Sequence, residues 1–182
     1  LCDFYKVSEP VTDDVILSYL GVKLDLFLPK LFPDVKDRRE LAFRAMGYSI
    51  EYVLQHPVGC CYDGVWDMLT SLSKKYSIYI VSNCLDAYVE TFLKISDTAD
   101  CISGFYTIQS GSKRDNIKKI TSTSEGKTLL VGDSDDDLLA IDDGYGVLFC
   151  YAAYGYKECS GYAYRIDKPM ELIAVTEQIE KK

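Results

Sequence analysis

The spacing of hydrophobic and polar residues changes once along the chain. Between Val11 and His56 apolar residues recur at helical spacing, and Gly and Pro residues interrupt the pattern. The interrupting residues are Gly21, Pro29, Pro33, Gly47 and Pro57. This pattern predicts several short helices rather than one long helix. We expect residues 1–58 to form a small helical unit. With about 50 residues, this unit is small for a domain that folds independently.

After Gly59 the pattern becomes an alternation of strands and helices. Runs rich in β-branched and aromatic residues predict strands at 76–81, 104–108, 128–131, 146–151 and 163–166. Amphipathic stretches predict helices at 65–75, 87–95, 115–121, 136–141 and from 169 onward. Strands separated by single helices imply parallel pairing through right-handed crossovers. The sequence therefore predicts an α/β fold over residues 59–182, with a parallel sheet covered on both faces.

Composition excludes several classes of function. The 182 residues carry a net charge of -8, which provides no basic field for nucleic acid or a membrane surface. No apolar run is long enough to span a bilayer. Seven scattered Cys residues form neither a disulfide framework nor a zinc motif, so we expect reduced thiols and a cytoplasmic location. The pattern leaves the oligomeric state open.

One predicted strand and one predicted loop end in residues that can hold a phosphate. In parallel sheets the chemistry gathers beyond the carboxyl ends of the strands. Ser82 and Asn83 follow one strand and precede a helix, where they either bind an anion or simply cap the helix. Lys113 stands where a polar loop enters a helix, and it either reaches a phosphoryl oxygen or is a solvated surface lysine.

A third strand end is strongly acidic. The apolar run before Gly132 is followed by Asp133, Ser134 and three further aspartates. Neighbouring carboxylates repel one another unless a cation is present, and Mg²⁺ prefers oxygen ligands. The alternative is an acidic first turn that complements a helix dipole. That alternative explains Asp135 and Asp136, but it does not explain Asp133, which directly follows the strand.

The order of these pieces resembles the haloacid dehalogenase superfamily. A Ser after a strand, a Lys at a loop and then Gly-Asp-Ser-x-x-Asp resemble its small-capped phosphatases, similar to phosphoglycolate phosphatase and β-phosphoglucomutase. Tyr62-Asp63-Gly64-Val65, Tyr154-Gly155-Tyr156 and residues 166–172 extend the likeness over residues 62–175. The resemblance implies a Rossmann-like parallel core, residues 59–182, with a small all-helical cap in residues 1–58.

The resemblance also implies a function. It is that of a Mg²⁺-dependent phosphohydrolase that cleaves a small phosphomonoester through an aspartyl-phosphate. Ser82 and Asn83 would bind the phosphoryl oxygens, and Lys113 would stabilise the intermediate. The cap would read the rest of the substrate, and a cationic cap residue meeting a substrate carboxylate is a reasonable expectation. The candidates are Lys30, Lys36, Arg38, Arg39 and Arg44.

The acidic turn would form the metal site. The resemblance implies that Asp133 ligates Mg²⁺ and that Asp137 holds the metal's water or Lys113 in position. Ser134 would support these two aspartates. The abundant tyrosines, including Tyr154 and Tyr156, are interpreted as packing residues.

The chain departs from the family pattern at one point. The Asp-x-Asp-Gly-Thr motif that supplies the family's nucleophile is missing, yet Leu1-Cys2-Asp3 and Ser8-Glu9-Pro10 resemble the residues that follow it. We therefore expect the nucleophilic Asp upstream, on a central strand between the Ser82 and Asp133 strands. The alternative is an inactive relative that binds a phosphate ligand or a protein partner. A phospho-accepting receiver domain is disfavoured because its acidic pair comes first in the chain.

Overall fold

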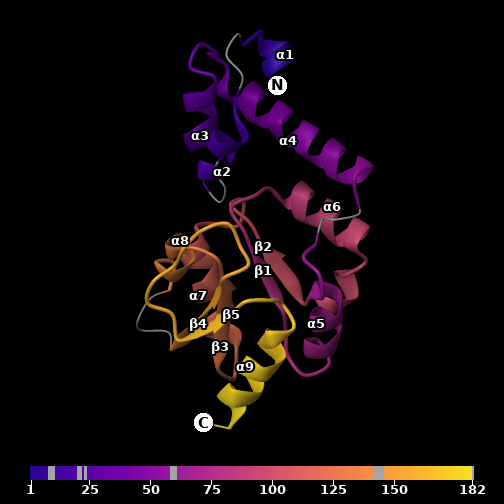
Figure 1. Ribbon diagram of the computed structural model, residues 1–182, viewed down its shortest axis with the longest axis vertical. Helices are drawn as coiled ribbons and strands as arrows, with labels where there is room; N and C mark the ends of the chain where they lie inside the picture. The colour runs from indigo at the N-terminus through magenta and orange to yellow at the C-terminus, as the bar shows by residue number, and fades with distance from the viewer. Residues whose placement is uncertain (8–10, 20–21, 23, 58–60, 142–145, 182) are drawn as a thin grey trace.

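The computed structural model describes residues 1–7, 11–19, 22, 24–57, 61–141 and 146–181. Its amino-terminal part is helical and lies at one end of the molecule (Figure 1). The helices are α1 (Cys2–Tyr5), α2 (Asp13–Ser18), α3 (Leu24–Leu31) and α4 (Arg38–Gln55). The carboxylate of Asp37 starts α4 by accepting the Glu40 N–H at 2.9 Å. The predicted helical stretch is confirmed.

Two of the predicted helix breakers do not break helices. Pro29 lies inside α3 and Gly47 lies inside α4, so these two predictions are wrong. Around Pro29 the helix is held by packing, because Leu28 and Phe32 are buried and the Phe32 N–H still donates to Leu28 O at 2.9 Å. Gly47 costs about 1 kcal/mol relative to Ala. The buried side chains of α4 outweigh that cost.

The remaining residues alternate between helices and strands, as predicted. The helices are α5 (Val65–Leu72), α6 (Asp86–Ser96), η1 (Ala99–Cys101), α7 (Lys113–Thr123), α8 (Asp135–Leu138) and α9 (Glu171–Glu180). The strands are β1 (Tyr79–Val81), β2 (Gly104–Tyr106), β3 (Thr128–Gly132), β4 (Val147–Ala152) and β5 (Tyr164–Ile166).

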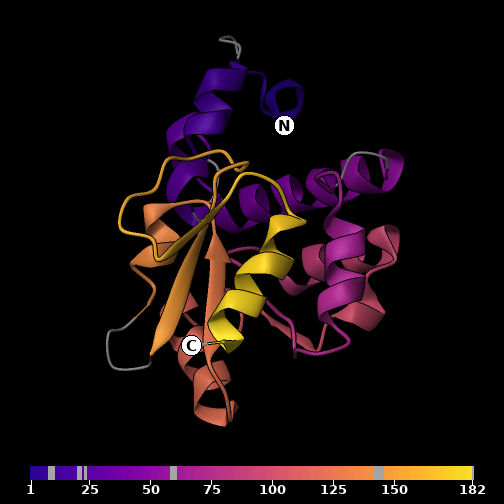
Figure 2. The same ribbon diagram turned by 60° about the horizontal axis from the view of Figure 1, so that its bottom comes forward.

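All strand pairing in the described residues is parallel, which confirms the predicted α/β class. β1 pairs with β2, and β3, β4 and β5 form a second sheet with β4 in the middle. Phe149, Cys150 and Ala152 on β4 are almost fully buried. In the views of Figures 1 and 2, α9 lies against this second sheet, and it also contacts α5. The side chains of α5, α9 and β4 share one hydrophobic cluster.

The described strands form two sheets rather than one continuous sheet. Within the described residues β1 pairs only with β2, and β3 has β4 as its partner on one edge only. Tyr79 and Val131 on these two strands are each 37% exposed, unlike the buried residues of β4. The chain passes from β2 through α7 to β3, and α7 also contacts β1. A free edge on each of two parallel strands leaves backbone donors and acceptors without ladder bonds.

The helical part has its own hydrophobic cluster, built on buried Leu28, Phe32, Leu41 and Ala45. The predicted domain boundary at residues 58 and 59, the Ser8-Glu9-Pro10 motif and Gly21 all lie outside the described residues. Of the helices that the structure describes, none is both long and apolar enough to cross a membrane. All six cysteines in the described part of the chain are free thiols.

Candidate active site

The residues after β1 and β3 meet at Lys113. Ser112 accepts the Asp115 N–H at 3.1 Å and thereby starts α7 at Lys113, with the lysine side chain facing the core. Lys113 donates to Asp137 and forms an ion pair with it. The two side chains are only 19% and 12% exposed. The two predicted site residues Lys113 and Asp137 therefore form a mostly buried ion pair.

Asp137 is held by donors on both carboxylate oxygens. Its Oδ1 faces Lys113, while its Oδ2 accepts the Asp133 N–H at 3.1 Å and the Ser134 hydroxyl at 2.9 Å. Ser134 caps α8 and stands three residues before Asp137, the spacing of a capping box. The carboxylate of Asp137 packs tightly over Gly132, where an added Cβ would lie 2.5 Å from the Asp137 Cβ. In the structure Asp137 therefore holds Lys113 and the Asp133 backbone in place.

Asp133 is oriented by the segment after β4. Its Oδ2 accepts the Tyr156 N–H at 2.9 Å, and its side chain occupies the space that a Cβ on Gly155 would need. No described residue donates a hydrogen bond to the other oxygen, Oδ1. Among the described residues, Asp133 therefore keeps one carboxylate oxygen without a hydrogen-bond donor.

A tyrosine cluster borders Asp133. The rings of Tyr62 and Tyr154 meet edge to face at a centroid separation of 4.9 Å, and Tyr156 lies 6.4 Å from Tyr62. Burial, a hydrogen bond with Tyr156 and the negative charge of Asp133 raise the pKa of Tyr62 to about 12. These tyrosines pack together, and they also form one wall beside Asp133.

The other aspartates of the acidic turn have different surroundings. Asp135 accepts the Ser160 N–H at 3.0 Å, and this hydrogen bond lowers the pKa of its carboxyl group. Asp136 is exposed. Both lie in the first turn of α8, as the helix-dipole interpretation predicts for them.

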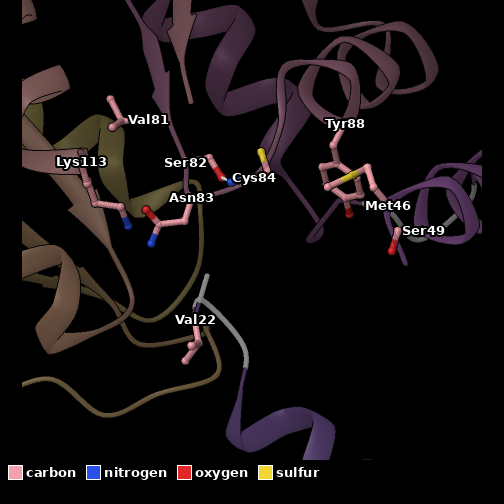
Figure 3. A pocket seen from close by; sticks show the side chains of 9 residues that line it. All are labelled: Val22, Met46, Ser49, Val81, Ser82, Asn83, Cys84, Tyr88 and Lys113. Atoms are coloured by element: carbon pink, nitrogen blue, oxygen red, sulfur yellow. Dashed lines mark hydrogen bonds between the residues drawn. The ribbon is translucent and has the colours of Figure 1, made fainter. Parts of the chain in front are cut away.

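A cavity of about 310 Å³ opens at the end of β1 (Figure 3). Nine of the described residues line it: Val22, Met46, Ser49, Val81, Ser82, Asn83, Cys84, Tyr88 and Lys113. The Ser82 hydroxyl accepts the Cys84 N–H at 3.3 Å. Burial raises the pKa of the Cys84 thiol, which favours its neutral form. The cavity thus unites three predicted site residues, Ser82, Asn83 and Lys113.

Sequence reasoning missed the residues that shape the loop before Lys113. Asn116 is completely buried, and its amide donates to Thr107 O at 2.9 Å and to Gly111 O at 3.2 Å. The hydroxyl of Thr107, also buried, donates to Asp86 on α6. A polar residue on the buried side of α7, beside Ile117, was the available signal. These bonds fix the loop that positions Lys113.

The acidic residues do not form a complete metal cage by themselves. In the described part of the chain no three His, Cys, Asp or Glu side chains are grouped so that they could hold a metal ion. Asp137 accepts hydrogen bonds on both oxygens, from Lys113 and from Ser134, so of the two predicted metal-site aspartates Asp133 is the one with an oxygen to spare. Mg²⁺ commonly takes one or two carboxylates and fills its remaining positions with water and phosphate oxygens. A site with Asp133 as one ligand therefore fits Mg²⁺.

Comparison with known proteins gives a structural match. No family model and no curated protein sequence matches this chain. A predicted phosphoglycolate phosphatase from Haemophilus somnus is 16% identical and superposes with a TM-score of 0.76, covering 96% of this chain and 86% of that one. A haloacid dehalogenase-like hydrolase from Streptococcus pneumoniae is 18% identical, with a TM-score of 0.74 and the same coverage.

A third solved structure contains a metal. It is a predicted haloacid dehalogenase-like (HAD) hydrolase, YfnB from Bacillus subtilis, bound to magnesium. It is 18% identical to this chain and superposes with a TM-score of 0.61, covering 96% of this chain and 87% of that one. Similarity at these identities establishes the fold. The predicted resemblance is confirmed at that level.

Proposed function

We propose that this chain, which has the haloacid dehalogenase-like fold, forms the phosphate- and magnesium-handling part of a phosphohydrolase that acts on a small phosphomonoester. One observation carries the proposal. Lys113 lines the cavity with Ser82 and Asn83, and the same ammonium group is paired with Asp137 beside Asp133. A cation at the end of β1 is thereby connected to the acidic turn after β3.

Phosphate would bind at the Lys113 end of the cavity. The Lys113 ammonium offsets the charge of the phosphoryl oxygens, and the Ser82 hydroxyl and Asn83 lie beside it in the lining. Asp137 fixes the ammonium group through its Oδ1. Because the pair is largely buried, its electrostatic effect on a bound phosphate is stronger than that of an exposed lysine.

Mg²⁺ would bind next to this phosphate. Asp133 would supply a carboxylate ligand through Oδ1, while Asp137 and Ser134 would hold the turn that presents it. When bound, the ion would neutralise charge on the phosphoryl group. The tyrosine wall formed by Tyr62, Tyr154 and Tyr156 would limit water access to Asp133.

The nucleophile would come from an additional strand. None of the nine cavity-lining residues that the structure describes carries a carboxylate. We propose that a segment upstream of Leu1 inserts parallel to β1 and β3 and carries an aspartate to the cavity. The aspartate oxygen would form a bond to phosphorus as the bond to the leaving oxygen breaks, and water would then cleave the acyl phosphate. A second carboxylic acid would protonate the departing alcohol. The free edges and partial exposure of β1 and β3 support this proposal.

A second candidate is a phosphate-binding protein without catalysis. The nine described residues that line the cavity include no carboxylate, which favours this candidate. The two candidates share the phosphate site and differ only in turnover.

Calorimetric titration of this chain with inorganic phosphate, with and without Mg²⁺, tests the shared site. We expect binding that Mg²⁺ strengthens and that Lys113→Met abolishes. Lys74→Met is the matched control, because it removes one positive charge from an exposed lysine beyond α5. Equal binding by the two variants would refute the phosphate site.

A further inference from the structure

The cavity has two chemically different ends. In Figure 3, Lys113 and Asn83 lie at one end, and Met46, Ser49 and Tyr88 lie at the other. Met46 and Ser49 belong to α4 of the helical part, whereas Tyr88 belongs to α6. The end opposite Lys113 is therefore built jointly by the helical part and the α/β part.

The described residues at the end formed by the helical part are uncharged. Among the nine described residues that line the cavity, Lys113 is the single cation and there is no acidic residue. Met46 is almost fully buried and presents a thioether. The Ser49 hydroxyl donates to Ala45 O at 2.9 Å, which leaves it one role toward a ligand, as an acceptor.

The cationic residues expected to meet a substrate carboxylate point elsewhere. Arg44 pairs with Glu40 at 2.6 Å and lies over the Phe4 ring. Arg38 donates to the carbonyl oxygens of Phe32 and Pro33. None of the five candidates lines the cavity; the five are Lys30, Lys36, Arg38, Arg39 and Arg44.

This lining discriminates between classes of leaving group. A carboxylate at the Met46 end would lose water without gaining a counter-ion, which is costly in a part-enclosed site. An aliphatic group would bury apolar surface against Met46 and Tyr88 at no such cost. A volume of about 310 Å³ is at the small end of ligand pockets, so the leaving group must also be short.

We propose that the cavity binds phosphomonoesters of short, uncharged alcohols and rejects those with a second anionic group. The proposal rests on the proposed function, since it assigns the phosphoryl group to Lys113. It makes Met46, Ser49 and Tyr88 the residues that determine specificity at the far end.

Two inert phosphonates with equal numbers of heavy atoms test the proposal in binding. Calorimetry compares 3-methylbutylphosphonate with 3-phosphonopropionate, which differ in replacing an isopropyl end by a carboxylate. We expect 3-methylbutylphosphonate, whose alkyl end is uncharged, to bind about tenfold more tightly than 3-phosphonopropionate, equivalent to about 1.4 kcal/mol. Equal or tighter binding of the carboxylate would overturn the inference while leaving the phosphate site intact. Failure of both compounds and of inorganic phosphate to bind would instead refute the proposed function.

A charge introduced at the far end gives the second measurement. Ser49 is exposed on α4, so Ser49→Arg adds a guanidinium at the cavity without disturbing the core. We expect this variant to lose the preference for 3-methylbutylphosphonate over 3-phosphonopropionate, whereas the matched Ser49→Gln variant keeps it. An unchanged preference in Ser49→Arg would show that the second group of the ligand lies elsewhere, and it would overturn the proposal.

Discussion

Replacing Asp137 by Asn tests how the site is held together. The native carboxylate accepts from Lys113 on Oδ1 and from the Asp133 N–H and the Ser134 hydroxyl on Oδ2. Asn has nearly the same shape, but only one of its two terminal atoms is an acceptor. Whichever way the amide turns, its NH₂ group faces a donor that was previously satisfied.

The magnitude follows from the lost bonds. If the amide oxygen stays with Asp133 and Ser134, the Lys113 ammonium loses a charge-assisted bond worth about 1.5–3 kcal/mol. Partial exposure of Lys113 lets water recover some of that loss. We therefore expect Asp137→Asn to reduce the free energy of unfolding by about 2 kcal/mol, and to lower the melting temperature by about 4–8 °C for a chain of this size.

Urea and thermal unfolding followed by circular dichroism measure this effect. Asp136→Asn is the matched control, because Asp136 is exposed in the same turn of α8 and should change stability by less than about 0.5 kcal/mol. Lys113→Met combined with Asp137→Asn completes a double-mutant cycle, which should give a coupling energy above about 0.5 kcal/mol. Equal stability of the two Asn variants, with no coupling to Lys113, would show that the Asp137 carboxylate does not hold Lys113 in place.

Three further predictions concern the surroundings of the site. Gly155→Ala should displace Asp133, weaken Mg²⁺ binding in calorimetry and lower the free energy of unfolding by about 1–3 kcal/mol. Gly126→Ala, whose added Cβ would have no neighbour within 4 Å, should have none of these effects. Asn116→Leu should cost about 2–4 kcal/mol in urea unfolding, because two backbone carbonyls lose their donor; no loss would contradict the role of this amide. The pKa of Tyr62 is raised from 10.0 to about 12, so the stability that its neutral phenol provides should be present below pH 10 and lost as pH rises through 12. Unfolding measured across that range should show a smaller loss in Tyr62→Phe, and an identical loss would contradict the assignment.

The alternating part of the fold was predictable because its strands and helices are short and strongly patterned. The strand before Gly132 and the helix entered at Lys113 begin and end within a few residues of their predicted bounds. The Pro29 and Gly47 predictions were wrong for a physical reason, since local propensity cannot register the packing that holds α3 and α4 together.

Ser82, Asn83 and Lys113 line one cavity, while their roles in a site stay predictions. Sequence spacing could not show that the Asp137 carboxylate accepts hydrogen bonds from Lys113 and Ser134. Asn116 was missed because a single Asn in a helix is ordinarily a surface residue. The uncharged lining from α4 depends on how the helical part sits over β1, which no local pattern encodes.

Turnover distinguishes a phosphohydrolase from a phosphate-binding protein. The full natural open reading frame, called the extended chain, would be assayed against a panel of phosphomonoesters with and without Mg²⁺. Its Asp133→Asn and Asp136→Asn variants and this 182-residue chain would be assayed beside it. We predict Mg²⁺-dependent phosphate release by the extended chain and by Asp136→Asn, and none by Asp133→Asn or by the 182-residue chain. Phosphate binding without turnover in the extended chain would contradict the hydrolase proposal and favour a binding protein.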